Sequence, residues 1–250
     1  MSAAPAAAVR MQGVWAGYAP GSPALRGVSM EVAPGERRVV VGPSGSGKST
    51  LLKVLAGLIR PSAGEVRVLG ATTGTRRRGA QQVGYVPQNV GLVATATVLQ
   101  NVMLGALART SAIRSALGSF PPGEYENAAE ALASTGLAHL ADRRAHELSG
   151  GERRRLAVAR ALVQRPALLL ADEFLSELDD LTAERVLGAL DRARERLGMT
   201  IVMVEHNLRV ACDFADRVTV LGAGEVVADA PSSEMDPSIL RGLLCPVAVA

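Results

Sequence analysis

Hydrophobic residues along this chain fall into short runs whose spacing changes from that of strands to that of helices. Segments 9–15 and 28–32 have strand character and are separated by a turn rich in proline and glycine. A buried strand is predicted at 37–41, a loop of glycine and serine follows it, and apolar residues at 51–59 predict a helix. Strand, loop and helix in this order are typical of a parallel α/β unit.

The middle of the chain has a different pattern. Residues from about 97 to 161 have mostly helical spacing, which Pro121-Pro122 must interrupt because proline lacks a backbone N–H. Before this stretch, further strands are predicted at 65–69 and 83–86. After it, strands and helices alternate again. Strands are predicted there at 167–172, 200–204, 217–221 and 225–229, and helices at 181–197 and 208–214. We therefore expect a helical lobe inserted between two β-rich halves.

Composition excludes several classes of protein. A chain of 250 residues with 48% hydrophobic residues can bury a sizeable core, which excludes global disorder. The net charge of +3 is too small to indicate nucleic-acid binding, and 3% aromatic residues are poor material for stacking bases. No apolar run approaches the ~18 residues that span a bilayer. Cys212 and Cys245 lie far apart, and we expect two free thiols.

The strongest chemical signal is a glycine-rich loop between the strand at 37–41 and the helix after it. Its sequence matches GxxxxGK[ST], in which glycines let backbone N–H groups turn toward phosphate oxygens. Lys48 is expected to contact the β- and γ-phosphates, and the Ser49 hydroxyl to ligate Mg²⁺. The flanking strand and helix argue against a chance turn. The candidate loop residues are Gly42, Pro43, Ser44, Gly45, Ser46, Gly47, Lys48, Ser49 and Thr50.

A second signal is the apolar run Leu168–Ala171, which ends in the acidic pair Asp172-Glu173. Carboxylates at the end of a parallel strand lie at the edge where ligands bind. Asp172 would hold the Mg²⁺ shell, and Glu173 would polarise an attacking water. By itself such a pair is more often a solvated strand end, but the phosphate loop upstream favours a site.

A third signal is Leu148–Glu152, which precedes a helical run. Ser149 is a natural helix N-cap, and Gly150 and Gly151 expose backbone N–H groups at the helix N-terminus. The segment can be a second anion site or an ordinary capped helix with a basic face. Glu152 fits both interpretations, as part of a signature or as the acid of a capping box.

The three motifs and the later His206 occur in one order and at suitable separations along the chain. In this arrangement the chain resembles the ATP-binding subunit of an ABC transporter over residues 9–244. The resemblance implies an α/β fold: a P-loop NTPase cassette with a RecA-like core, an antiparallel β subdomain and an inserted α-helical subdomain. It implies one domain with two short tails. The core and β subdomain would be 9–88 and 165–230, the helical subdomain with the signature 89–164, and the tails 1–8 and 245–250.

The resemblance also assigns roles to single residues. Tyr18 would stack on adenine, while the nearby Trp15 is expected in the core. Gln88 would sense Mg²⁺ and the γ-phosphate, and Asp179 would lie in the loop that crosses a dimer interface. His206 would contact the γ-phosphate.

Partners follow from the same resemblance. ATP and Mg²⁺ would be the cofactors, and Ser149–Gly151 of a second copy would close over the ATP of the first. Transmembrane permease subunits would dock near Gln88 on the cytoplasmic face of the inner membrane, with an extracytoplasmic solute-binding protein acting indirectly. No nucleic-acid partner is expected. The chain departs from the family at Phe174-Leu175, where Pro-Thr is frequent, and at Glu177, where a small residue is common.

The transported solute has two competing signals. Residues 102–120 resemble the helical lobe of phosphonate-import ATPases, which favours import of phosphonate, phosphite or a related oxyanion. Residues 151–155 and 204–208 look more like ATPases of lipopolysaccharide export or branched amino-acid uptake. A soluble ABC ATPase acting on nucleic acid is a further alternative, disfavoured by the single phosphate loop and the lack of a cysteine cluster. A non-hydrolysing regulatory module is disfavoured by Glu173 and His206.

Overall fold

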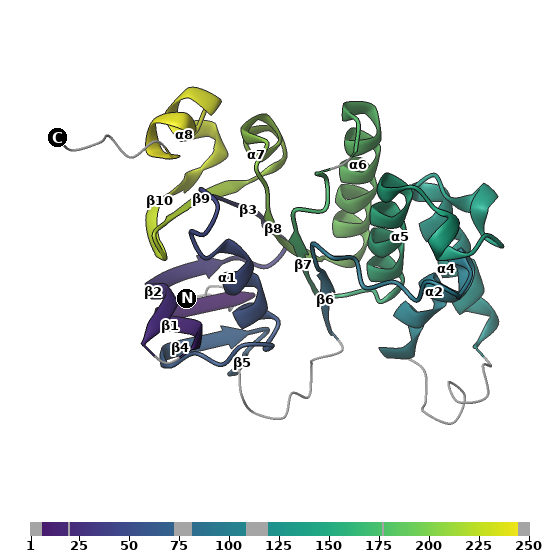
Figure 1. The fold of residues 1–250 in the computed structure, drawn as a ribbon, viewed down its shortest axis with the longest axis horizontal. Coiled ribbons are helices and arrows are strands. Elements are labelled where there is room, and N and C mark those ends of the chain that lie inside the picture. The colour runs from purple at the N-terminus through teal and green to yellow at the C-terminus, as the bar shows by residue number, and fades with distance from the viewer. Residues whose placement is uncertain (1–6, 20, 73–81, 109–119, 177, 245–250) are drawn as a thin grey trace, which may run out of the picture. The chain divides into compact units, whose positions relative to one another are not determined.

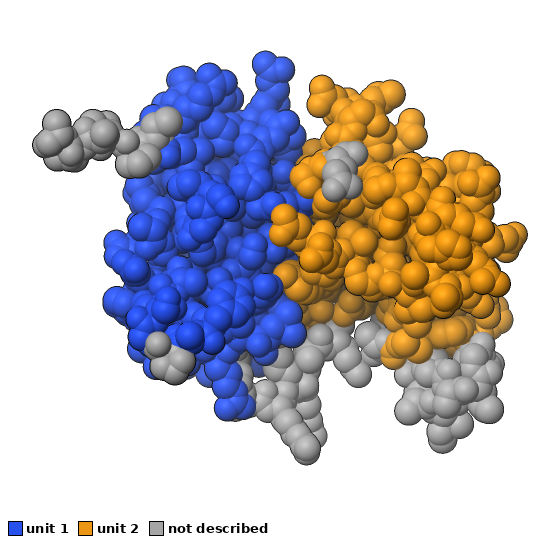
Figure 2. All heavy atoms as spheres, viewed as in Figure 1, with its two compact units in different colours: residues 1–79, 170–173, 199–250 blue, residues 80–169, 174–198 orange. Residues whose placement is uncertain are grey.

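The structure is a computed structural model that describes residues 7–19, 21–72, 82–108, 120–176 and 178–244 (Figure 1). The arginine run at 76–78, Glu177 and part of the lobe resembling phosphonate importers lie outside the described residues. Two compact units are present (Figure 2). The first unit comprises residues 1–79, 170–173 and 199–250, and the second comprises 80–169 and 174–198.

An antiparallel sheet of order β2-β1-β4-β5 forms the N-terminal part of the first unit. Its strands are β1 (Val9–Ala19), β2 (Ser22–Val32), β4 (Ala63–Val68) and β5 (Ala71–Thr72). Alternate residues Val9 and Met11 of β1 are buried, as the sequence pattern predicts. The alternation then shifts at Gly13, whose φ is 55° and where the pairing of β1 with β2 is irregular. This bulge turns Trp15 outward, 42% exposed, so the prediction that Trp15 lies in the core is wrong.

A second, mainly parallel sheet forms the centre of the first unit in the order β10-β9-β3-β8-β7. Strand β3 runs parallel to both β8 and β9, and β10 returns antiparallel to β9. The bounds are β3 (Arg37–Val41), β7 (Leu168–Asp172), β8 (Thr200–Val204), β9 (Arg217–Gly222) and β10 (Glu225–Pro231). Buried residues fill β7 and β8 completely, as expected for parallel strands covered on both faces.

Among the described residues, four helical segments belong to the first unit: α1 (Lys48–Leu55), α7 (Leu208–Phe214), the 3₁₀ turn η5 (Ser232–Glu234) and α8 (Pro237–Leu244). The predicted bounds of α7 are confirmed. Helix α1 begins earlier and ends earlier than the apolar run at 51–59 predicts. Its end is followed by Gly57 in the left-handed conformation, with φ 73°. Helix α8 does not correspond to any helix predicted from the sequence pattern.

The most deeply buried charged side chain among the described residues belongs to the first unit. Arg38 of β3 is only 1% exposed. Its guanidinium forms an ion pair with Glu36 at 2.6 Å and another with Asp229, and it donates to the Thr219 hydroxyl at 2.9 Å. A buried cation is costly unless it is paired and hydrogen-bonded, and here both conditions are met.

Helices dominate the second unit, as predicted for the middle of the chain. They are α2 (Val98–Met103), η2 (Leu104–Ala108), α4 (Pro122–Ser134), η3 (Ala138–Leu140), η4 (Ala145–Glu147), α5 (Gly150–Val163) and α6 (Asp180–Leu197), with strand β6 (Val83–Val86) beside the start of β7. A core that includes Val102, Leu132 and Leu156 joins α2, α4 and α5. Pro122 occupies the first turn of α4, where a missing N–H costs nothing. Among the described helices, none is long and apolar enough to cross a membrane.

Candidate functional site

The glycine-rich loop of the first unit follows β3 and opens α1, as the motif requires. A Cβ atom added to Gly42 would lie 2.2 Å from the Leu221 carbonyl oxygen, so only glycine fits there. At Gly47, the N-cap of α1, φ is 100° and an added Cβ would lie 2.4 Å from the Ala24 carbonyl oxygen. The Ser46 hydroxyl is buried and has no hydrogen-bond partner among the described residues. The loop is therefore a close-packed backbone cradle with a spare polar group.

Lys48 lies inside this cradle and is 5% exposed. Its ammonium donates to the Gly42 carbonyl at 2.9 Å and to the Pro43 carbonyl at 3.0 Å. Burial lowers the pKa of Lys48, while the nearby carboxylates of Glu173 and Asp172 work against that shift. The ammonium is thus held among neutral carbonyl oxygens, ready to interact with a stronger acceptor such as a phosphate.

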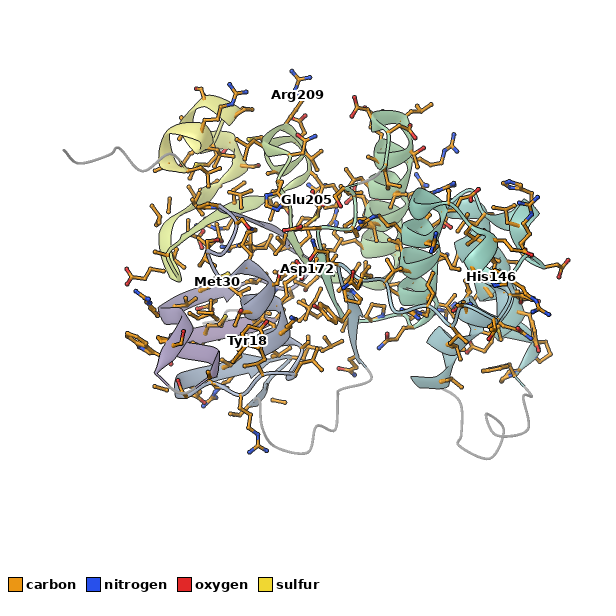
Figure 3. The ribbon with its side chains drawn as sticks, in the orientation of Figure 1. Tyr18, Met30, His146, Asp172, Glu205 and Arg209 are labelled. Atoms are coloured by element: carbon orange, nitrogen blue, oxygen red, sulfur yellow. The ribbon has the colours of Figure 1, made fainter. Side chains whose placement is uncertain are left out.

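Asp172 ends β7 and is 2% exposed (Figure 3). Its Oδ1 accepts a hydrogen bond from the Ser49 hydroxyl at 3.1 Å. Burial raises the pKa of Asp172, the Ser49 hydrogen bond opposes the shift, and Glu173 adds to it. Two oxygen donors, far apart in the sequence, therefore meet beside the start of α1. Oxygen donors are what Mg²⁺ prefers, so these residues fit that ion.

Glu173, the next residue, has a left-handed backbone with φ 48°. Its N–H donates to the Val204 carbonyl at 3.1 Å, which ties the end of β7 to the end of β8. Its Oε1 lies 2.6 Å from His206 Nε2, and the imidazole is half exposed while the carboxylate is mostly buried. A non-glycine residue in this conformation is strained, and such strain clusters at functional sites. The structure thus joins two residues that the sequence only places in order.

Tyr18 lies near the end of β1 and is 67% exposed. Its hydroxyl accepts a hydrogen bond from the Lys53 ammonium at 2.9 Å, and the same ammonium lies 5.2 Å from the centre of its ring. The tyrosine ring is therefore tied to α1, which also carries Lys48 and Ser49. Sequence reasoning missed Lys53 as the residue that orients this ring.

In the second unit, Ser149 caps α5. Its hydroxyl accepts from the Glu152 N–H at 3.3 Å, and the Glu152 carboxylate accepts from the Ser149 N–H at 2.8 Å. Both halves of a capping box are present, so the predicted N-cap and capping acid are confirmed. The hydrogen bond from the Ser149 backbone is the main reason that the pKa of Glu152 is lowered. Gly150 and Gly151 form the first turn of the helix.

The other expected residues of the second unit lie on separate elements. Asp179 is the N-cap of α6 and accepts from the Thr182 N–H at 2.9 Å, and its hydrogen bonds with Thr182 lower its pKa. Gln88 is exposed just after β6. Phe174, at the position where the resemblance expects proline, is fully buried.

A comparison with protein-family models finds a match to the model described as ABC transporter over residues 25–176. This chain belongs to the ABC transporter family. The matched segment runs from β2 to just beyond Glu173, and so includes the phosphate loop, the capped helix α5 and the acidic strand end.

Relatives and solved structures from the same ABC transporter family cover nearly the whole chain. The phosphonates import ATP-binding protein PhnC of Bordetella parapertussis is 37% identical, covering 94% of this chain and 96% of that protein. The protein of the same name from Maricaulis maris is 42% identical over 84% of this chain and 83% of its own length. The ATP-binding cassette MJ0796, solved as a dimer with ADP and Pi, has a TM-score of 0.80 at 31% identity and covers 90% of this chain and 98% of its own.

The predicted fold class is confirmed by these comparisons, as is the predicted enzyme class. The chain is an ABC-type ATPase, which binds ATP and hydrolyses it. Its two sheets and its helices are consistent with such a cassette.

Two further residues of this ABC ATPase were missed in the sequence, and both hold the loop that follows Gln88. The buried Asn101 side chain accepts from the Val93 N–H at 2.9 Å and donates to the Val93 carbonyl at 3.0 Å. Arg160 of α5 donates to the Gly91 carbonyl at 2.8 Å and to the Val90 carbonyl at 2.9 Å. Since α5 begins at Gly150, directly after its N-cap Ser149, one helix connects this loop to the signature segment. For Asn101, an asparagine within an apolar helical pattern is a signal that the sequence itself contains.

Proposed function

We propose that this ABC ATPase drives the import of phosphonates or related phosphorus oxyanions through a separate permease. The observation that supports the substrate is the identity of 35–42% to proteins named as phosphonate import ATP-binding subunits, over most of both chains. The observation that supports the mechanism is the cluster of Lys48, Ser49, Asp172, Glu173 and His206 in one unit. The subunit would lie peripherally on the cytoplasmic face of the inner membrane.

In this proposal the phosphate loop holds the phosphates and Tyr18 holds the base. The cradle fits such a ligand because a side chain at Gly42 or Gly47 would clash with neighbouring backbone and distort the loop, and because the Ser46 hydroxyl lacks a partner within the described chain. The backbone N–H groups of the loop and of the first turn of α1 would donate most favourably to a multiply charged anion. Tyr18 would stack on adenine, with its ring held by Lys53.

Ser49 and Asp172 would hold Mg²⁺, with Gln88 as a further ligand. Bound there, the ion would neutralise charge that develops on the transferred phosphoryl group. Burial disfavours the ionised form of Asp172 in the ligand-free protein, and a cation would offset that cost.

Glu173 would take a proton from the attacking water at its carboxylate, and His206 would contact the γ-phosphate. The 2.6 Å contact of Glu173 Oε1 with His206 Nε2 orients the carboxylate, and the left-handed backbone of Glu173 fixes where that carboxylate leaves the strand. Proton transfer needs such a group within hydrogen-bond reach of the water, because the transfer distance is short.

A second copy of the chain would complete the site. Ser149, Gly150 and Gly151 of that copy would donate to the γ-phosphate, and Asp179 would lie at the dimer interface, with ATP held between the two copies. The dimeric structure of the related cassette MJ0796 supports this arrangement.

We assign residues 9–88 and 165–230 to the core and β subdomain and 89–164 to the helical subdomain. The permease would dock near Gln88, and an extracytoplasmic solute-binding protein would supply it.

Growth of a deletion strain tests the substrate. A strain lacking this chain and any redundant system should fail to grow with phosphonates or phosphite as its phosphorus source, and the wild-type chain should restore growth. Uptake of branched amino acids and the outer-membrane lipid content serve as matched controls and should not change. Normal growth on every phosphonate and on phosphite would refute the substrate, and the ATPase assignment would stand.

A further inference from the structure

Arg160 of α5 binds the loop that follows Gln88 with both terminal nitrogens of its guanidinium. One nitrogen donates to the Gly91 carbonyl at 2.8 Å, and the other donates to the Val90 carbonyl at 2.9 Å. Hydrogen bonds from a charged donor are stronger than those from a neutral one. Burial lowers the pKa of Arg160, and partial removal from water strengthens both bonds. The loop is therefore firmly attached to α5 at this residue.

A second side chain of α5 binds the strand that precedes Gln88. The Gln164 amide donates to the Val83 carbonyl of β6 at 2.9 Å. Arg160 and Gln164 lie four positions apart at the end of a helix, so they project from the same side of it. The chain on each side of Gln88 is thus attached to one face of one helix.

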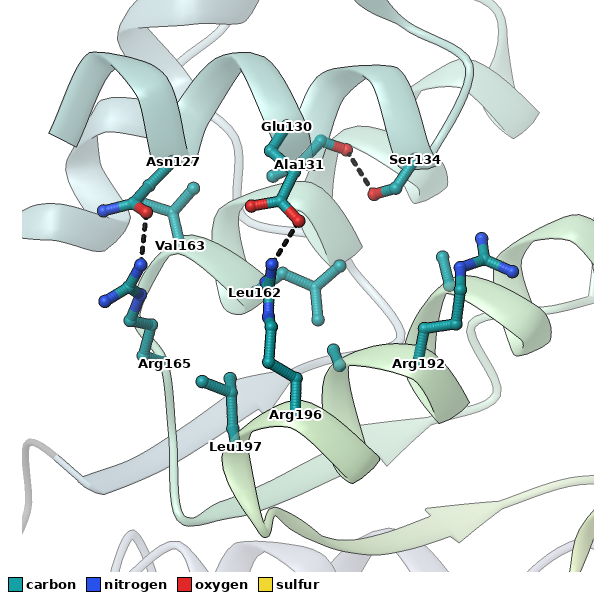
Figure 4. Close-up of a pocket in the computed structure, with 12 residues that line it drawn as sticks. Asn127, Glu130, Ala131, Ser134, Leu162, Val163, Arg165, Arg192, Arg196 and Leu197 are labelled. Carbon is teal, nitrogen blue, oxygen red and sulfur yellow. Dashed lines mark hydrogen bonds and ion pairs between the residues drawn. The ribbon is translucent and has the colours of Figure 1, made fainter. Parts of the chain in front are cut away.

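The end of α5 is also fixed to the other helices of its unit. A Cβ atom added to Gly105 of η2 would lie 2.2 Å from the Arg160 carbonyl oxygen, so η2 approaches the α5 backbone closely at this turn. Leu162 and Val163 face α4 and α6 instead, where they line a pocket (Figure 4). The face of α5 that holds the segment around Gln88 is therefore distinct from the face that meets these two helices.

The other end of α5 is the segment proposed to contact the nucleotide of a second copy. Helix α5 runs from Gly150 to Val163 with Ser149 as its N-cap. Arg160 follows Ser149 by about three helical turns, or roughly 16 Å at the rise of an α-helix. Beyond Gly151 the helix contains no glycine or proline, the residues at which helices most often kink. It is therefore a continuous link between Ser149 and Arg160.

We propose that Arg160 is a positioning residue, which makes the location of Gln88 depend on whether Ser149 and Gly151 contact a nucleotide. Closure of one copy over the ATP of the other would fix the N-terminus of α5. Arg160, supported by Gln164, would then hold the loop after Gln88 in a matching place. This inference rests on the proposed function, from which it takes the contact between Ser149 and the nucleotide. Arg160 acts through the loop backbone and not on the nucleotide itself.

Hydrogen–deuterium exchange, measured by mass spectrometry on the full chain, tests this link. The Glu173→Gln protein should retain ATP, and size-exclusion chromatography first verifies its dimer. In that protein, ATP and Mg²⁺ should slow amide exchange at 149–153 and also at 88–93. Adding Arg160→Gln should leave the slowing at 149–153 and remove it at 88–93. Exchange at 88–93 with ATP should become faster by about tenfold or more, because two charge-assisted hydrogen bonds are lost.

The matched control is Arg192→Gln, which removes an exposed arginine of α6 in the same unit and should leave both responses unchanged (Figure 4). Arg160→Lys keeps the charge and can donate to one of the two carbonyls, so it should restore part of the slowing at 88–93. If thermal unfolding shows that Arg160→Gln is not folded, Arg160→Lys takes its place, and a partial loss of slowing is expected.

Two outcomes would overturn the inference while the proposed dimer stands. Full slowing at 88–93 in the Arg160→Gln dimer would mean that the loop responds through Gln88 alone. A Glu173→Gln dimer without any slowing at 88–93 would mean that α5 transmits nothing to the loop. A Glu173→Gln protein that stays monomeric with ATP would contradict the proposed dimer itself, and the inference would fall with it.

Discussion

The N-terminus of α1 in the first unit and that of α5 in the second both follow segments that contain glycine and serine. The two N-termini differ in how their backbone N–H groups are capped. Helix α1 has Gly47 at its N-cap, no side-chain hydrogen bond to its first turn and no acidic residue there. Helix α5 has a complete capping box, in which Ser149 and Glu152 satisfy backbone donors reciprocally. The first terminus leaves its N–H groups for an external anion, while the second already has an internal carboxylate.

This difference indicates that the two segments do not bind phosphate alike. The loop before α1 carries its own cation, Lys48, and its own carboxylate partners in one unit, so it forms an anion site by itself. The N-terminus of α5 needs no ligand for stability. We therefore infer that it contributes to nucleotide binding only when a second copy closes over a nucleotide held elsewhere.

The largest effect should come from Lys48→Ala. Removing the buried ammonium leaves phosphate charge without its main counter-charge in a poorly solvated cradle, so we expect loss of ATP binding and of turnover by about 10²-fold or more. Fluorescent-nucleotide binding and phosphate release measure both. The control is Lys53→Ala, whose ammonium is hydrogen-bonded to the Tyr18 hydroxyl and lies over the Tyr18 ring rather than in the phosphate loop, and this change should cost much less. Near-normal turnover of Lys48→Ala would contradict the claim that the loop before α1 forms a phosphate site by itself.

Glu173→Gln should separate binding from hydrolysis. The amide keeps the shape of the side chain but cannot take a proton, so hydrolysis should fall by about 10²–10⁴-fold while ATP binding remains. Since ATP would persist, the two copies should stay together, and size-exclusion chromatography with ATP and Mg²⁺ should show a dimer. A variant that binds ATP but stays monomeric would contradict the role proposed for α5.

Ser149→Asp sharpens the comparison, because aspartate is as good an N-cap as serine but carries a negative charge. We expect unchanged thermal stability and a loss of turnover of about 10²-fold through repulsion of the γ-phosphate. Ser149→Thr, which keeps the cap and stays neutral, should retain most of the activity. Full turnover of Ser149→Asp would mean that this segment is only a helix cap.

The smallest effect concerns stability at the end of β7. Burial raises the pKa of Asp172, so this carboxyl stabilises the ligand-free fold below the ordinary pKa of aspartate, and that contribution is lost as pH rises through the raised value. At neutral pH, Asp172→Asn should therefore stabilise the nucleotide-free protein by about 1 kcal/mol, while Mg²⁺-dependent hydrolysis is lost. Thermal unfolding with and without ATP and Mg²⁺ measures this, and Asp213→Asn, an exposed carboxyl of the same unit, is the control.

Much of the fold follows from local sequence. The bounds of β3, β6, β8 and α7 match the predicted ones because continuous apolar runs are bounded by turn residues. Trp15 was placed wrongly because the bulge at Gly13 shifts the alternation of β1 by one residue. Helix α8 was missed although it is no shorter than α7, because Pro237 at its start and Gly242 within it are residues typical of turns.

The sequence by itself determined the phosphate loop, the capped start of α5 and the order of the motifs, because each depends on residues within a few positions of one another. Only the tertiary structure decided which distant residues meet. Ser49 contacts Asp172 across 123 positions, and Glu173 contacts His206 across 33. Such contacts depend on how strands and helices pack against one another, and packing is a property of the whole chain that no local spacing records.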